Sequence, residues 1–362
     1  MPSQTLEDRM DGANRRARDC GLVPPPETLA ELFCRVTADG ADPRSRAWET
    51  VSDKERGNPM DKAMQELCLL NKPKSSISVQ VTDYVPDFVA DLLRGLSPLA
   101  RWLLVHEAAV DTSIRTLRTM ADEALVADES HIGTLSRGAD VLGVTVATAR
   151  DEVARAIGAI LQSDRGDVLG SYHFGTDRKY ILIHWIPIWL FARRLGVDYA
   201  ALLHVTLAHE YAHYYTHLGR DSNAGGDQRG NQRNHRADVD EFSLREFESV
   251  DDLDIRELDR AFHRMDLEVK EGLAQFYTFL LCNKWIRASE PWSNSPLVAF
   301  NALLGRQSRP YLWWSEWRQP PEVVRSAILR ARSADEQVSG QTWIDYLQLE
   351  ATHRRPARAS RT

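Results

Sequence analysis

The spacing of hydrophobic and polar residues changes along the chain and predicts both strands and helices. Residues 76–82 alternate Ile77, Val79 and Val81 with polar neighbours, which is typical of a strand. Residues 179–184 also predict a strand. Strands and helices of this kind, with helices in the majority, predict a helix-rich α+β fold.

The clearest helix signals lie in the second half of the chain. Pro187 predicts the start of a helix that ends near Gly196. Asp198 is suited to cap a long helix over 199–218, and Gly219 is suited to end it.

Residues 134–163 predict two helices joined by a sharp turn, a pattern that resembles a helix-turn-helix. Gly143 would form the turn and Thr145 would cap the second helix. Two interpretations remain open, namely DNA recognition and a plain α-hairpin that packs a core. The second helix carries two arginines and two acidic residues, so it brings no net positive charge to DNA phosphates.

Composition excludes several classes of protein. The 362 residues are 43% hydrophobic and 27% charged, which excludes a wholly disordered or fibrous chain. A net charge of −7 is not typical of a general nucleic-acid binder. The most apolar stretch, 181–191, is too short to span a membrane, and the polar start shows no secretory signal. The four cysteines show no CxxC spacing, so we expect free thiols and a cytoplasmic protein.

The predicted helix over 199–218 contains the motif HExxH, formed by His209, Glu210 and His213. Residues i and i+4 lie on one face of a helix, so the two imidazoles can converge on one metal ion. Glu210 projects beside them, where it can reach a water molecule on the metal. The motif therefore predicts a metal site.

A catalytic zinc ion needs three protein ligands and one open position. His217 continues the same stripe, but the eight residues that separate it from His209 rise by about 12 Å, so the two cannot share one ion. The third ligand must therefore come from another segment. A second helix is predicted from Asp254 to Trp285 and contains the sequence LEVKEGLAQFY.

An HExxH helix followed by a glutamate in an EGLA-type helix resembles the gluzincin branch of the zincin metallopeptidases. The resemblance covers roughly 170–285 and implies that Glu271 is the third zinc ligand. Glu268 is the second choice for this ligand, or a residue that orients a histidine, a role also open to His217. The chain departs from the metzincin branch at Gly219, where that pattern needs a third histidine.

The resemblance implies a peptidase that uses one Zn²⁺ and acts on a peptide or protein. Glu210 would be the general base, and His263 or Tyr311 could stabilise charge on the carbonyl oxygen. The strand at 179–184 would bind an extended substrate as an edge strand, or else be buried. Two other functions remain open: a DNA-associated regulator with a protease site, and a non-catalytic protein that uses zinc as a clamp.

The chain is expected to divide into four parts. They are a weakly structured region at 1–75 with short helices at 27–36 and 60–70, a helical domain at 76–168, a zincin-like catalytic domain at 169–350 and a disordered tail at 351–362.

Overall fold

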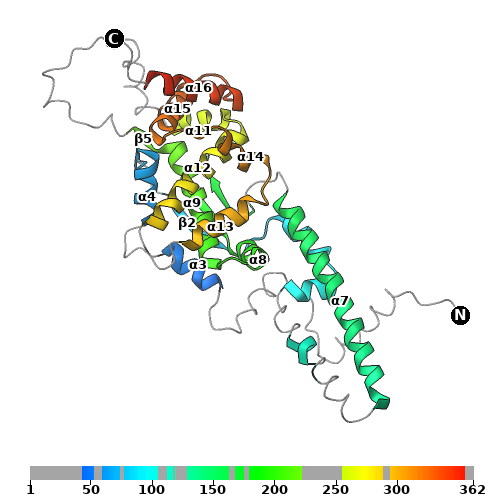
Figure 1. Ribbon diagram of the computed structural model, residues 1–362. Coiled ribbons are helices and arrows are strands. Elements are labelled where there is room, and N and C mark those ends of the chain that lie inside the picture. The colour runs from blue at the N-terminus through cyan, green and yellow to red at the C-terminus, as the bar shows by residue number, and fades with distance from the viewer. Residues whose placement is uncertain are drawn as a thin grey trace, which may run out of the picture.

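Long helices dominate the computed structural model, and the strands among its described residues form two small sheets (Figure 1). The structure describes residues 43–52, 59–73, 77–104, 112–116, 119, 129–162, 168–174, 179–221, 255–287 and 294–354. The helices are α3 (Pro43–Ser52), α4 (Pro59–Cys68), α5 (Asp87–Arg94), α7 (Glu129–Leu161), α8 (Trp185–Leu195), α9 (Tyr199–Leu218), α11 (Ile255–Arg264), α12 (Leu267–Arg287), α13 (Asn294–Leu304), α14 (Arg309–Leu312), the 3-10 helix η3 (Trp313–Glu316), α15 (Pro321–Ser333) and α16 (Gly340–His353). The fold is a helix-rich α+β arrangement, as the sequence predicts.

The larger sheet is mixed and has the strand order β2-β4-β3. Its strands are β2 (Ser78–Thr82), β3 (Gly170–His173) and β4 (Tyr180–His184). Strand β4 pairs in parallel with β2 and antiparallel with β3, so it is the central strand. The expectation that 179–184 is an edge strand is therefore wrong. Ile181 and Ile183 are fully buried, as a central strand requires.

The second sheet consists of β1 (Leu70–Asn71) and β5 (Arg220–Asp221), two short strands that pair antiparallel. This pairing joins the end of α4 to the end of α9. Helix α4 also buries Met60, Met64 and Cys68, which lie one turn apart. The expectation that residues 1–75 are weakly structured is therefore wrong for 59–73. The short helix predicted at 60–70 agrees with α4.

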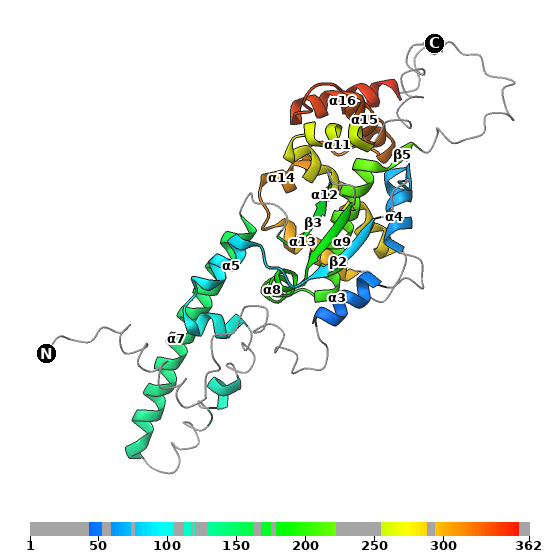
Figure 2. The same ribbon diagram turned by 180° about the vertical axis from the view of Figure 1, so that it is seen from behind.

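Helix α9 lies at the centre of the fold and packs most extensively against α12 (Figure 2). Its start and end agree with the predictions. The Asp198 carboxylate accepts a hydrogen bond of 2.8 Å from the Ala201 amide, and the helix ends at Leu218, before Gly219. The preceding helix, α8, ends at Gly196, whose φ of 65° lies in the left-handed region that glycine favours.

A buried guanidinium completes the hydrogen bonding at the end of α9. Arg332 of α15 is 5% exposed and donates to the carbonyl oxygens of Tyr215 and Thr216 at 3.0 and 2.8 Å, and also to that of Gly219. The last carbonyls of a helix lack partners within the helix, so this contact stabilises the end of α9. More than a hundred residues separate Arg332 from α9, and no sequence signal pointed to the contact.

Helix α7 is continuous from Glu129 to Leu161, so the predicted turn at Gly143 is wrong. Glycine in a helix interior costs only about 1 kcal/mol relative to alanine, which a helix of this length tolerates. The Thr145 hydroxyl donates to the Val141 carbonyl at 2.7 Å, within the same helix, so Thr145 does not cap a second one. The helix extends away from the body of the fold with α5 beside it, and its carboxyl-terminal end lies against that body (Figures 1 and 2).

The helix predicted over Asp254 to Trp285 is divided into α11 and α12. The break occurs at Met265, which forms a bridge with Val338. The Asp266 amide donates to the Val338 carbonyl at 3.0 Å, and the Val338 amide donates to the Arg264 carbonyl at 2.9 Å. A distant segment thus takes the hydrogen bonds that would have continued the helix.

The remaining expectations have mixed outcomes. Strand β2 and helix α8 lie where they were predicted. Cys68 and Cys282 are buried free thiols, whereas Cys20 and Cys34 lie outside the described residues, as do the helix expected at 27–36 and most of the tail. Among the helices that the structure describes, none is long and apolar enough to cross a membrane.

Because α4 packs against α9 and β2 pairs with β4, segments before residue 83 share one core with the second half of the chain. The expected division into four parts did not foresee this shared core.

Candidate metal centre

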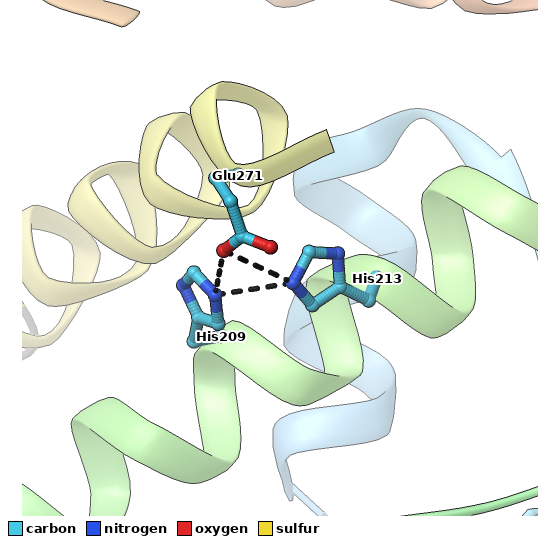
Figure 3. A group of neighbouring side chains, drawn as sticks. All are labelled: His209, His213 and Glu271. Atoms are coloured by element: carbon cyan, nitrogen blue, oxygen red, sulfur yellow. Dashed lines mark hydrogen bonds and ion pairs between the residues drawn. The ribbon is translucent and has the colours of Figure 1, made fainter. Parts of the chain in front are cut away.

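The two histidines of the motif lie one turn apart on α9 and face α12 (Figure 3). The Nε2 atoms of His209 and His213 are 3.1 Å apart. This arrangement follows from the helix alone, since residues four apart lie on one face. That α9 turns this face toward α12 is decided by the tertiary structure.

Glu271, in the second turn of α12, supplies the third group. Its Oε2 atom lies 3.0 Å from His209 Nε2 and 3.6 Å from His213 Nε2. The Glu271 side chain is only 7% exposed. The three potential ligand atoms lie within 4.8 Å of one another, and this is the only such group among the residues that the structure describes.

The three ligand atoms fit one metal ion. A tetrahedral ion with bonds of about 2.0–2.1 Å holds its ligand atoms about 3.3–3.4 Å apart. The three separations observed here, 3.0, 3.1 and 3.6 Å, bracket that value. The group of His209, His213 and Glu271 can therefore hold a metal ion.

The electrostatics of His209 and Glu271 favour the protonation states that bind metals. Burial lowers the pKa of His209, although its hydrogen bond with Glu271 acts in the opposite direction. Burial alone would raise the pKa of Glu271, but the attraction of His213 and hydrogen bonds from both imidazoles lower it below its ordinary value. Neutral imidazole and ionised carboxylate are the forms that coordinate a metal ion.

Glu210 lies beside the group and forms part of the wall of a pocket. The pocket is also lined by His209 and Tyr311. Glu210 is 3% exposed. Gly170, the first residue of β3, allows the strand to approach Glu210 closely, because a Cβ atom at this position would lie 3.0 Å from Glu210 Oε1.

Of the two candidates for stabilising charge on the carbonyl oxygen, the structure brings Tyr311 and not His263 next to the group. Its ring centroid lies 6.0 Å from that of His209. His263 is exposed and lies against Phe174, with 4.6 Å between ring centroids. The Glu268 carboxylate lies against Gly340, at the amino-terminal end of α16, where a Cβ atom would collide with it. A carboxylate at this end of a helix is favoured by the helix dipole.

His217 belongs to a buried polar network beside the metal centre. Its Nδ1 atom lies 3.0 Å from the Tyr172 hydroxyl, and its Nε2 atom lies 3.1 Å from Asp259 Oδ1. Lys179 donates to both oxygens of Asp259 at 2.7 Å. Burial alone would raise the pKa of Asp259, but hydrogen bonds from His217 and Lys179 lower it to about 2. Burial lowers the pKa of His217 to about 4.

The same network holds α11 against the ligand helix. Phe262 of α11 stacks on His217 with 4.6 Å between ring centroids, and its ring is edge-on to His213 at 6.3 Å. Asp259 lies one turn earlier on α11. His217 therefore packs against Phe262, which also contacts His213. It is not part of the group that can bind a metal ion. The sequence placed His217 near the site but gave no signal for Asp259 or Phe262.

Compared with known proteins, the chain matches no family, and no curated protein or solved structure resembles it significantly. What the metal centre does has to be inferred from its own residues.

Proposed function

We propose that this protein is a zinc-dependent metallopeptidase. The observation that carries the proposal is the convergence of His209, His213 and Glu271, with Glu210 beside them at the wall of a pocket. Two histidines, one glutamate and an open fourth position form a donor set found in catalytic zinc sites of peptidases. The resemblance of the HExxH and EGLA segments to gluzincins supports the same conclusion.

Each residue of the centre has a role in this reaction. His209, His213 and Glu271 would hold Zn²⁺, which would lower the pKa of a bound water and polarise the peptide carbonyl. The Glu210 carboxylate would take a proton from the attacking water and deliver it to the leaving amine. Tyr311, whose ring lies near His209, would donate a hydrogen bond to the oxygen on which negative charge develops.

Strand β3 is the better candidate for binding an extended substrate. It is a terminal strand of its sheet, so one of its edges is not paired within that sheet. Gly170 lies in this strand and Glu210 lies next to it. A substrate strand that paired with β3 would pass alongside the metal centre. The alternative function of a DNA-associated regulator loses its structural support, because α7 is one continuous helix and not a helix-turn-helix.

Removal and return of zinc test the proposal directly. We expect the full chain to bind one zinc ion and to cleave peptides in a mixed peptide library. A chelator should abolish cleavage, and stoichiometric zinc should restore it. Metal analysis and mass spectrometry of the products provide the measurements. If the zinc-loaded protein cleaved nothing, yet unfolded on chelation, the zinc would be a structural clamp and the proposal would fail.

Replacing Gly170 by Ala should lower the rate without affecting metal binding. The added Cβ atom would lie 2.9 Å from Thr206 Cγ2 and 3.0 Å from Glu210 Oε1, so the Glu210 side chain would have to move. A displacement of this kind costs about 10–100-fold in rate. Gly158→Ala is the matched control, because a Cβ atom at Gly158 meets nothing within 4 Å. Equal rates for the two variants would show that the close approach of β3 has no role.

A further inference from the structure

The pocket beside Glu210 has walls that are largely apolar. Its apolar lining comes from Ile160, Val168, Leu169, Phe191, Val205 and Leu303. These residues belong to α7, the segment before β3, α8, α9 and α13. Segments far apart in the sequence thus form one hydrophobic surface that ends at His209 and Glu210.

The polar groups of the pocket are almost all uncharged. Gln275 is buried and donates from Nε2 to Gln307 Oε1 at 3.0 Å. Thr206 and Tyr311 also line the pocket, and the Thr206 hydroxyl donates to the Leu202 carbonyl within α9 at 3.0 Å. Apart from His209 and Glu210, which belong to the candidate metal centre, none of the lining residues that the structure describes can carry a charge near neutral pH.

This lining determines which side chains could enter. A cationic or anionic side chain would lose its hydration without gaining a partner of opposite charge among the apolar walls and carboxamides. A large apolar side chain would lose no hydrogen bonds and would bury its surface.

We propose that this pocket binds a large apolar side chain, of the leucine, methionine or phenylalanine class, on a residue that flanks the scissile peptide bond. The proposal rests on the proposed metallopeptidase function and adds the class of substrate to it. His209 and Glu210 are among the residues that line the pocket, so a side chain inside it would belong to a residue close to the reacting carbonyl. The Gln275–Gln307 pair offers no opposite charge to a charged side chain in the pocket.

Gln307 offers a direct way to change this preference. In Gln307→Glu, the new carboxylate can still accept the hydrogen bond that Gln275 donates, so the local structure is retained. The same substitution places a negative charge in the pocket and would favour a lysine or arginine side chain. Gln307→Leu is the matched control, since it changes the same position without adding charge.

The test uses pentapeptides Ac-Ala-Ala-Xaa-Ala-Ala-NH2, in which Xaa is Leu, Phe, Ala, Lys or Glu. Their binding to the zinc-loaded Glu210→Gln protein is measured by calorimetry, and their cleavage by the protein with Glu210 intact is measured by mass spectrometry. We expect the Leu and Phe peptides to bind and react about 10–100-fold better than the Ala, Lys and Glu peptides. Gln307→Glu should lose this preference and favour the Lys peptide, with unchanged zinc content, whereas Gln307→Leu should keep the apolar preference.

The two proposals fail in different ways. Cleavage that needs zinc and Glu210 but shows no apolar preference, or the same preference in Gln307→Glu, would overturn the pocket proposal alone. Absence of cleavage of every peptide and of the mixed library would overturn the peptidase proposal. The binding measurement would then test the pocket proposal on its own, without any activity assay. Equal affinities for the Leu and Ala peptides would overturn the pocket proposal.

Discussion

Replacing Glu210 by Gln should leave zinc bound and lower the rate of peptide hydrolysis by about 10²–10⁴-fold, which is the usual contribution of a general base. The Glu210 side chain is not one of the three groups that converge on the metal position, so its amide analogue should not weaken metal binding. Glutamine has nearly the same shape as glutamate but cannot take up the proton. The rate should therefore fall while the fold and the zinc content stay constant.

Zinc content and kcat/KM for a cleaved peptide, measured on the same preparations, check this expectation. Glu257→Gln is a suitable control, because Glu257 is an exposed glutamate on α11, and this variant should keep the full rate. Full activity in Glu210→Gln would exclude Glu210 as the base. A loss of zinc in the same variant would instead show that Glu210 contributes to metal binding.

Replacing Glu271 by Ala should weaken zinc binding by more than about 100-fold, because even residues that only orient a ligand contribute 10–100-fold. Glu271 provides the only carboxylate oxygen in the group of three, and it lies within 3.6 Å of both imidazoles. Without it, two imidazoles remain, which is fewer than the three protein ligands of a catalytic zinc site. His213→Ala should have a comparable effect.

Competition with a chelator of known affinity measures this change. Glu268→Ala is the matched control, since Glu268 lies one turn earlier on α12 but its carboxylate lies against Gly340 of α16. This control should keep the zinc affinity of the unchanged protein. Zinc retained by Glu271→Ala and lost by Glu268→Ala would move the third ligand to Glu268 and contradict the geometry described above. Circular dichroism of each variant would show whether the helices are intact.

Local signals in the sequence were sufficient for the helix that carries the motif. Asp198 and Gly219 mark its ends, and the spacing of His209 and His213 fixes their common face. These features depend on hydrogen bonds and side-chain directions within one helix, which a short stretch of sequence encodes. The turn predicted at Gly143 failed because a single interior glycine costs a helix only about 1 kcal/mol relative to alanine, which is not enough to end a helix of this length.

The sequence by itself determined that two imidazoles share one face of a helix, that a glutamate stands beside them and that the chain is rich in helices. Only the tertiary structure decided that Glu271 faces these imidazoles and Glu268 does not, that β4 is the central strand with β3 at one edge of the sheet, and that Asp259 and Phe262 hold α11 against α9. This difference between what the sequence determines and what the tertiary structure decides has a physical reason. Helix spacing is set by bonds between near neighbours, whereas these contacts arise when segments tens to hundreds of residues apart pack together, and no local spacing records that packing.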